Sequence, residues 1–144
     1  LILGQFKSPF SLEQNTGCAA LHTIIRAKIV DELGAPQRDI GAMIYGNPVS
    51  FAEFWVAVMN GTGRGEADDN KNKHLIGRLV VQPFAPLRIG GSCRYGTSPS
   101  AVQGNTEESK HIRYSLETQI EYAGMLFQGE YIYGRDEGIN LGGG

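Results

Sequence analysis

The sequence predicts an all-β fold, built as an up-and-down antiparallel sheet. From His111 to Gly134, apolar and aromatic side chains alternate with polar and charged ones on both sides of Gly124. Successive side chains of a strand point to opposite faces, so each run has one oily face and one charged face. Each run is also about ten residues long, which suits a strand that crosses a bilayer.

Seven segments are predicted as strands, and several of them show the same alternation of apolar and polar side chains. They are Leu1 to Lys7, Asp39 to Gly46, Phe51 to Asn60, His74 to Phe84, Leu87 to Gly96, His111 to Ala123 and Met125 to Gly134. In the fourth segment Ile76 and Val80 share the parity of Arg78, and the third segment is apolar on both faces. The alternation is therefore clearest in the last three strands.

The links between these strands alternate between long and short. The long links are Ser8 to Arg38, Gly61 to Lys73 and Thr97 to Lys110, and the short ones are Asn47 to Ser50, Ala85 to Pro86, and Gly124. In an up-and-down sheet alternate links lie at opposite ends, and outer-membrane barrels have short turns at one end and long loops at the other. The link lengths favour a transmembrane β-barrel, seen here in part. The alternation of apolar and polar side chains, taken alone, fits a soluble β-sandwich or small barrel equally well.

The first long link is expected to contain one short helix. Apolar residues recur near helical spacing over Cys18 to Leu33, after Asn15 or Thr16 as a cap, and Gly34 would end the helix. Inside a barrel, such a helix can fold into the lumen and narrow it. An ordinary surface helix packed on a sheet is the alternative.

Composition and motifs exclude several classes of protein. The net charge of -2 gives no sign of a nucleic-acid partner, and no run of eighteen apolar residues predicts a transmembrane helix. Cys18 and Cys93 allow one disulfide at most. The chain starts inside a predicted strand and ends on three glycines, so a piece of a longer protein is expected.

No arrangement of residues predicts an enzyme, a cofactor or a metal site. The three histidines lie in separate elements without metal-ligand spacing, and the glycine-rich segment after Asn60 is not followed by a helical pattern. Asp68, Asp69 and Asn70 do not match an EF-hand loop. Glu117 and Glu121 are about 13 Å apart along one strand, which is too far for a glycosidase pair unless the next strand supplies the second carboxylate at Glu130; solvated carboxylates on a polar face are the favoured interpretation.

Basic residues are the candidate functional residues. Four arginines fall on the polar parity of three successive strands, and three more basic residues lie in or after the helical link: Arg78, Arg88, Arg94 and Arg113, then Arg26, Lys28 and Arg38. Around a water channel they would form a cationic wall that favours anions. Glu117, Glu121 and Glu130 share this parity and would weaken the preference. The alternative is a mixed-charge surface of a soluble module that binds a small polar ligand.

An ordered set of short motifs resembles the phosphate-selective porin O and P family of bacterial outer-membrane channels. The set covers nearly the whole chain and comprises Gly4 to Glu13, Arg26, Arg38 to Gly41, Met59 to Gly61, Asp69 to Asn70, Gly77 to Leu79 and Gln128 to Tyr131. No single motif is specific, so the resemblance depends on their order.

The resemblance implies a passive channel in the bacterial outer membrane, in contact with lipid, that passes small solutes and in some members prefers phosphate. It implies a barrel of about sixteen strands, usually a homotrimer, of which residues 1–144 are part of one domain. The segment 8–38 would be an inward-folded constriction loop, with Arg26 and Arg38 as its matching basic positions.

Overall fold

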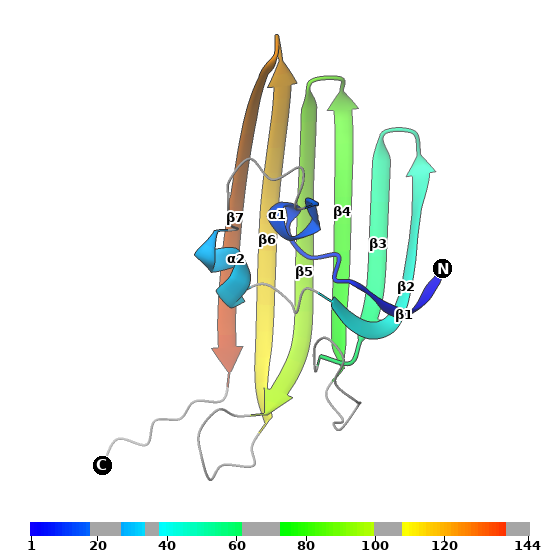
Figure 1. Ribbon diagram of the computed structural model, residues 1–144, viewed down its shortest axis with the longest axis vertical. Helices are drawn as coiled ribbons and strands as arrows, with labels where there is room; N and C mark the ends of the chain where they lie inside the picture. Colours follow the sequence, from blue (N-terminus) through cyan, green and yellow to red (C-terminus); the bar gives the residue numbers. More distant parts are fainter. Residues whose placement is uncertain (18–26, 34–37, 62–72, 100–107, 138–144) are drawn as a thin grey trace, which may run out of the picture.

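Seven strands in chain order form one antiparallel sheet (Figure 1). The computed structural model describes residues 1–17, 27–33, 38–61, 73–99 and 108–137. The strands are β1 (Ile2–Lys7), β2 (Arg38–Val49), β3 (Ala52–Met59), β4 (His74–Phe84), β5 (Leu87–Pro99), β6 (Glu108–Tyr122) and β7 (Met125–Glu137). The predicted all-β, up-and-down fold is confirmed. The last three strands, with 13, 15 and 13 residues, are far longer than the five or six residues typical of globular proteins.

The three short links lie together at one end of the sheet, the upper end in Figure 1. They join β2 to β3, β4 to β5 and β6 to β7. In the last of these, Ala123 and Gly124 both have positive φ, 51° and 77°. A two-residue hairpin turn of type I′, whose twist matches the strands, needs positive φ at both central residues, and glycine adopts it without strain.

The described residues of the first link contain two short helices, and one of them lies within the helix predicted over Cys18 to Leu33. They are α1 (Leu12–Asn15) and α2 (Lys28–Leu33), and residues 18–26 lie outside the described part. Ala27 is not helical but starts α2: its carbonyl accepts from the N–H of Val30, and its own N–H donates to the Glu13 carboxylate at 3.1 and 3.2 Å. The one-helix prediction is therefore wrong in extent. Among the described residues, neither helix is long and apolar enough to cross a membrane.

The oily face of the sheet is exposed. Strand register places Leu116 between Gly91 and Tyr131, and both large side chains are over 60% exposed. Other members of this outward face are also exposed, among them Tyr114, Ile120 and Phe127. No second layer of the described chain covers these residues, so the face is available to an apolar solvent.

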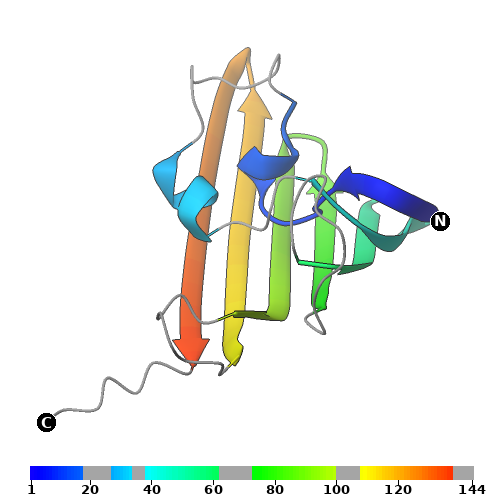
Figure 2. The same ribbon diagram turned by 60° about the horizontal axis from the view of Figure 1, so that its bottom comes forward.

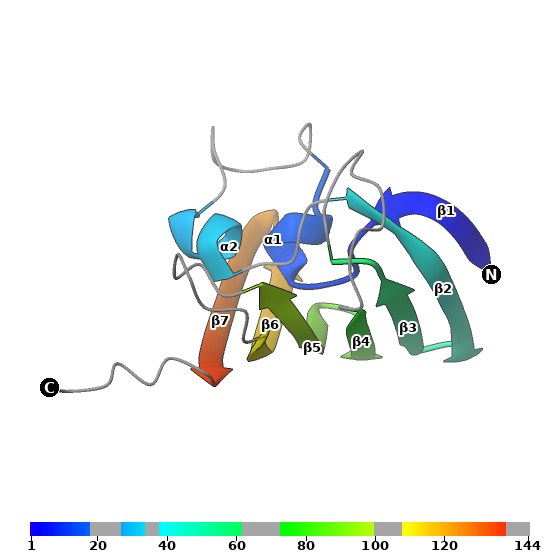
Figure 3. The ribbon, with the colours of Figure 1, turned by 90° about the horizontal axis from the view of Figure 1, so that it is seen from below.

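The opposite face is concave and carries both helices (Figures 2 and 3). Phe10 and Val30 from the first link are buried there. They join a cluster with side chains of the sheet, including Ala57, Met59, Ile76 and Ile132. The core of the described chain is thus the contact between the first link and the concave face. This contact explains why Ile76 breaks the alternation of polar residues in β4.

Candidate functional site

The register gathers the predicted charged residues of the strands on the concave face. Glu117 of β6 lies opposite Glu130 of β7, and Arg94 of β5 lies opposite Arg113 of β6. Arg78, Arg88 and Glu121 share this face. Glu121 is four residues from Glu117 on the same strand, and the register partners of Arg78 and Arg88 are an even number of residues from Arg94 and Glu117. The seven strand residues therefore share the face of the sheet that carries the two helices.

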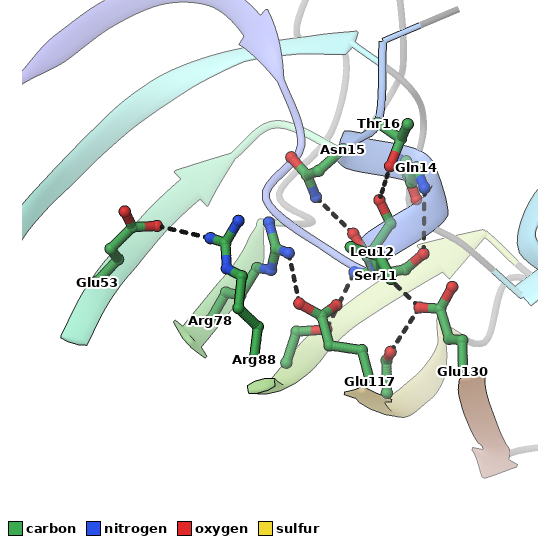
Figure 4. A network of polar contacts seen from close by, with 12 residues as sticks. Ser11, Leu12, Gln14, Asn15, Thr16, Glu53, Arg78, Arg88, Glu117 and Glu130 are labelled. Atoms are coloured by element: carbon green, nitrogen blue, oxygen red, sulfur yellow. Dashed lines mark hydrogen bonds and ion pairs between the residues drawn. The ribbon is translucent and has the colours of Figure 1, made fainter. Parts of the chain in front are cut away.

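Arg78 and Glu117 form a buried ion pair at the centre of this surface (Figure 4). The guanidinium donates to Glu117 Oε1, and the two side chains are 9% and 4% exposed. Arg78 also lies 5.1 Å from the centre of the Trp55 ring, within range of a cation–π contact. Gly90 lies opposite Glu117, where a Cβ would overlap the carboxylate, so glycine makes room for the pair.

A second pair, Arg88 with Glu53, is exposed in a pocket of about 440 Å³. The two charged groups are 3.3 Å apart, and their side chains are 45% and 40% exposed. The pocket lies between α1 and the strands, and its lining includes Asn15, Thr16, Trp55, Gln119 and Gln128. The lining therefore combines amides, hydroxyls and one exposed guanidinium with apolar side chains.

The remaining two arginines are buried in another cluster, beside two histidines. Arg113 pairs with Asp136 at 2.6 Å and donates to the carbonyl of Arg135 at 3.0 Å. Asp136 also lies 3.4 Å from His111, whose ring meets His74 edge-on. Arg94 is only 8% exposed. Arg94 and Arg113 oppose each other across β5 and β6, and the Asp136 carboxylate offsets part of their repulsion by pairing with Arg113.

The loop residues predicted from sequence are distributed differently. Lys28 is exposed on α2, and Arg38 is exposed at the start of β2 with the outward parity of Ile40. Arg26 and Cys18 lie outside the described residues, and Cys93 is a free thiol on the outward face. In the described part of the chain, no group of three or more His, Cys, Asp or Glu residues could hold a metal ion.

Sequence reasoning named Glu130 as a polar-face residue but missed that it attaches α1 to the sheet, and it missed Ser92 and Ser11. Glu130 accepts from the N–H groups of Leu12 and Glu13, and Ser92 accepts from the N–H of Ser11 (Figure 4). The Ser11 hydroxyl caps α1 by accepting from the Gln14 N–H. A serine followed three residues later by glutamine is a signal of a helix start, and it was available in the sequence.

Comparison with known proteins assigns the chain to a family. The family model for phosphate-selective porin O and P matches residues 1–141 of the 144-residue chain. Searches of curated proteins and of solved structures gave no significant match. The long antiparallel strands, the exposed oily face and the polar concave face agree with the family match. The chain therefore belongs to the phosphate-selective porin O and P family of bacterial outer-membrane porins.

Proposed function

We propose that this chain lines a passive diffusion channel that favours small anions such as phosphate. The observation that carries the proposal is the pairing of an exposed oily face with a polar concave face onto which the first link is folded. Lipid would meet the first face and water the second. The link Ser8 to Arg38 would narrow the passage. The homotrimer implied by the family resemblance remains a prediction.

Arg88 is the arginine of the described sheet that best suits contact with a passing anion. The side chains of Arg78 and Arg113 are 9% and 10% exposed, and Arg94 as a whole residue is 8% exposed. The Arg88 side chain, in contrast, is 45% exposed. An exposed ion pair contributes little stability, so an anion can compete with Glu53 for the guanidinium. A guanidinium offers a phosphate two parallel hydrogen bonds. Lys28 and the unplaced Arg26 would add positive charge from the loop.

Ion selectivity of the full protein in planar bilayers tests this proposal. In a KCl gradient, Arg88→Gln should lower the chloride-to-potassium permeability ratio and Glu53→Gln should raise it, each by about four- to sixteenfold. One unit charge about 5 Å from the ion path in water, partly screened by salt, changes the permeability of one ion by about two- to fourfold, and it acts on the anion and the cation in opposite directions. Each variant is the matched control for the other, because both break the same exposed pair.

Two results would contradict the proposal in different ways. A wild-type protein that inserts without conducting would exclude the channel. A conducting protein whose permeability ratio is unchanged in both variants would exclude Arg88 from the ion path and leave the channel itself standing.

A further inference from the structure

The Glu130 carboxylate is fully engaged by the first link and by its own sheet. Its Oε1 accepts from the N–H of Leu12 at 2.9 Å and from the Ser115 hydroxyl at 2.8 Å. Its Oε2 accepts from the N–H of Glu13 at 3.3 Å. Among the described residues, no lysine or arginine forms an ion pair with it. The negative charge is thus stabilised by the backbone donors of the link.

The attachment continues from Glu130 to the second helix. Glu13 receives the Glu130 contact through its backbone, and its own carboxylate accepts the N–H of Ala27, directly before α2. The chain of contacts therefore runs from β7 to α1 and on to α2. Loss of the first contact would loosen both helices, because α1 carries the acceptor that holds the start of α2.

Two other contacts hold the link on the sheet without a charged group. The Ser11 N–H donates to Ser92 Oγ at 3.1 Å, and Phe10 is completely buried against the concave face. A neutral hydroxyl and an apolar ring hold the segment close to the sheet. Glu130 adds three charge-assisted hydrogen bonds from a fixed strand position, and such bonds are shorter and stronger than neutral ones.

We infer that Glu130 is a positioning residue that holds the first link against the concave face and so sets the width and steadiness of the passage. The inference rests on the proposed channel function. It assigns Glu130 a role other than repelling anions, because both carboxylate oxygens already have partners.

Single-channel recording of the full protein tests this inference with three variants. Glu130→Ala removes all three hydrogen bonds, and Glu130→Gln keeps the size of the side chain but offers one acceptor oxygen in place of two. Glu121→Ala is the matched control, because it removes the same charge from the same face at an exposed position outside the network. A helix with its side chains is about 10–12 Å wide, so release of α1 should widen the passage and raise the conductance of Glu130→Ala above that of the wild type.

Expected results separate positioning from charge. Glu130→Ala should show higher conductance with added open-channel noise, Glu130→Gln should lie between it and the wild type, and Glu121→Ala should keep the wild-type noise. In detergent, trypsin should cut after Lys28 faster in Glu130→Ala than in Glu121→Ala, while heat-modifiable migration on a gel stays unchanged. Faster cleavage reports loop release even without a conductance measurement.

The failures are also distinguishable. If the wild type conducts and Glu130→Ala matches Glu121→Ala in noise and in tryptic cleavage, the inference is overturned and the channel stands. If tryptic cleavage rises in Glu130→Ala but the conductance and noise of a conducting channel do not change, Glu130 anchors the link without controlling the passage, which also overturns the inference. A protein that never conducts overturns the proposed function.

Discussion

Replacing Leu116 with arginine tests which solvent meets the oily face. Leu116 lies near the middle of β6, and its side chain is 64% exposed. On the lipid face of a barrel, an arginine at the bilayer midplane costs about 2–4 kcal/mol, but near the interface only about 0–1 kcal/mol. In water, an exposed substitution of this kind stays within about 0.5 kcal/mol. If lipid meets the oily face, an arginine there should lower the free energy of unfolding strongly at the middle of the strand and little at its end.

Two control variants separate the effect of depth in the bilayer from the effect of the face of the sheet. Tyr122→Arg is the control for depth, because Tyr122 lies on the same outward face at the end of β6, beside the tight turn, and is 69% exposed. Gln128→Arg lies on the concave face, opposite Gln119. Only Leu116→Arg should lose about 2–4 kcal/mol, which is roughly a 30- to 900-fold shift of the unfolding equilibrium.

Reversible urea unfolding from lipid vesicles measures this difference. The three variants should refold and migrate on gels as the wild type does under strongly native conditions, with Leu116→Arg unfolding at lower urea. Equal stability of the three variants would refute the assignment of the oily face to lipid, and with it the membrane orientation of the sheet.

Two further predictions concern the concave face. Phe10→Ala should weaken docking of the first link by about 3–5 kcal/mol, because it empties the site of a fully buried ring, and faster tryptic cleavage after Lys28 would report it. Glu117→Leu should cost about 3–5 kcal/mol by leaving Arg78 buried without its partner, whereas the double variant with Arg78→Met should recover most of this loss in the same urea assay. Comparable stability of the single and double variants would argue against a buried pair.

Strands and faces were predictable from the sequence because they depend on local patterns. Alternation with a period of two sets which side chains share a face, and all seven predicted segments overlap β1 to β7. The alternating link lengths also identified the end with tight turns. The bounds were less exact, since β6 begins three residues before the predicted His111 and β2 includes Arg38.

The contacts of the first link were not predictable in the same way. Phe10 joins the same buried cluster as Ile76, and Leu12 donates to Glu130, far along the chain. Local periodicity contains no information about such pairs. The apolar residues on the polar parity, such as Ile76, were the indirect sign that something covers that face. The prediction that the segment 8–38 is a constriction loop came from the family resemblance and not from periodicity.

The charge pairs suggest how a wall with balanced charges can still distinguish ions. A buried pair such as Arg78 with Glu117 acts at a distance as a dipole, so its field falls off faster than that of a single charge. The exposed pair of Arg88 and Glu53 can separate when an anion arrives, because water and salt weaken its attraction. Stability and selectivity should then reside in different pairs. Breaking the buried pair should shift unfolding more than ion preference, and breaking the exposed pair should do the reverse.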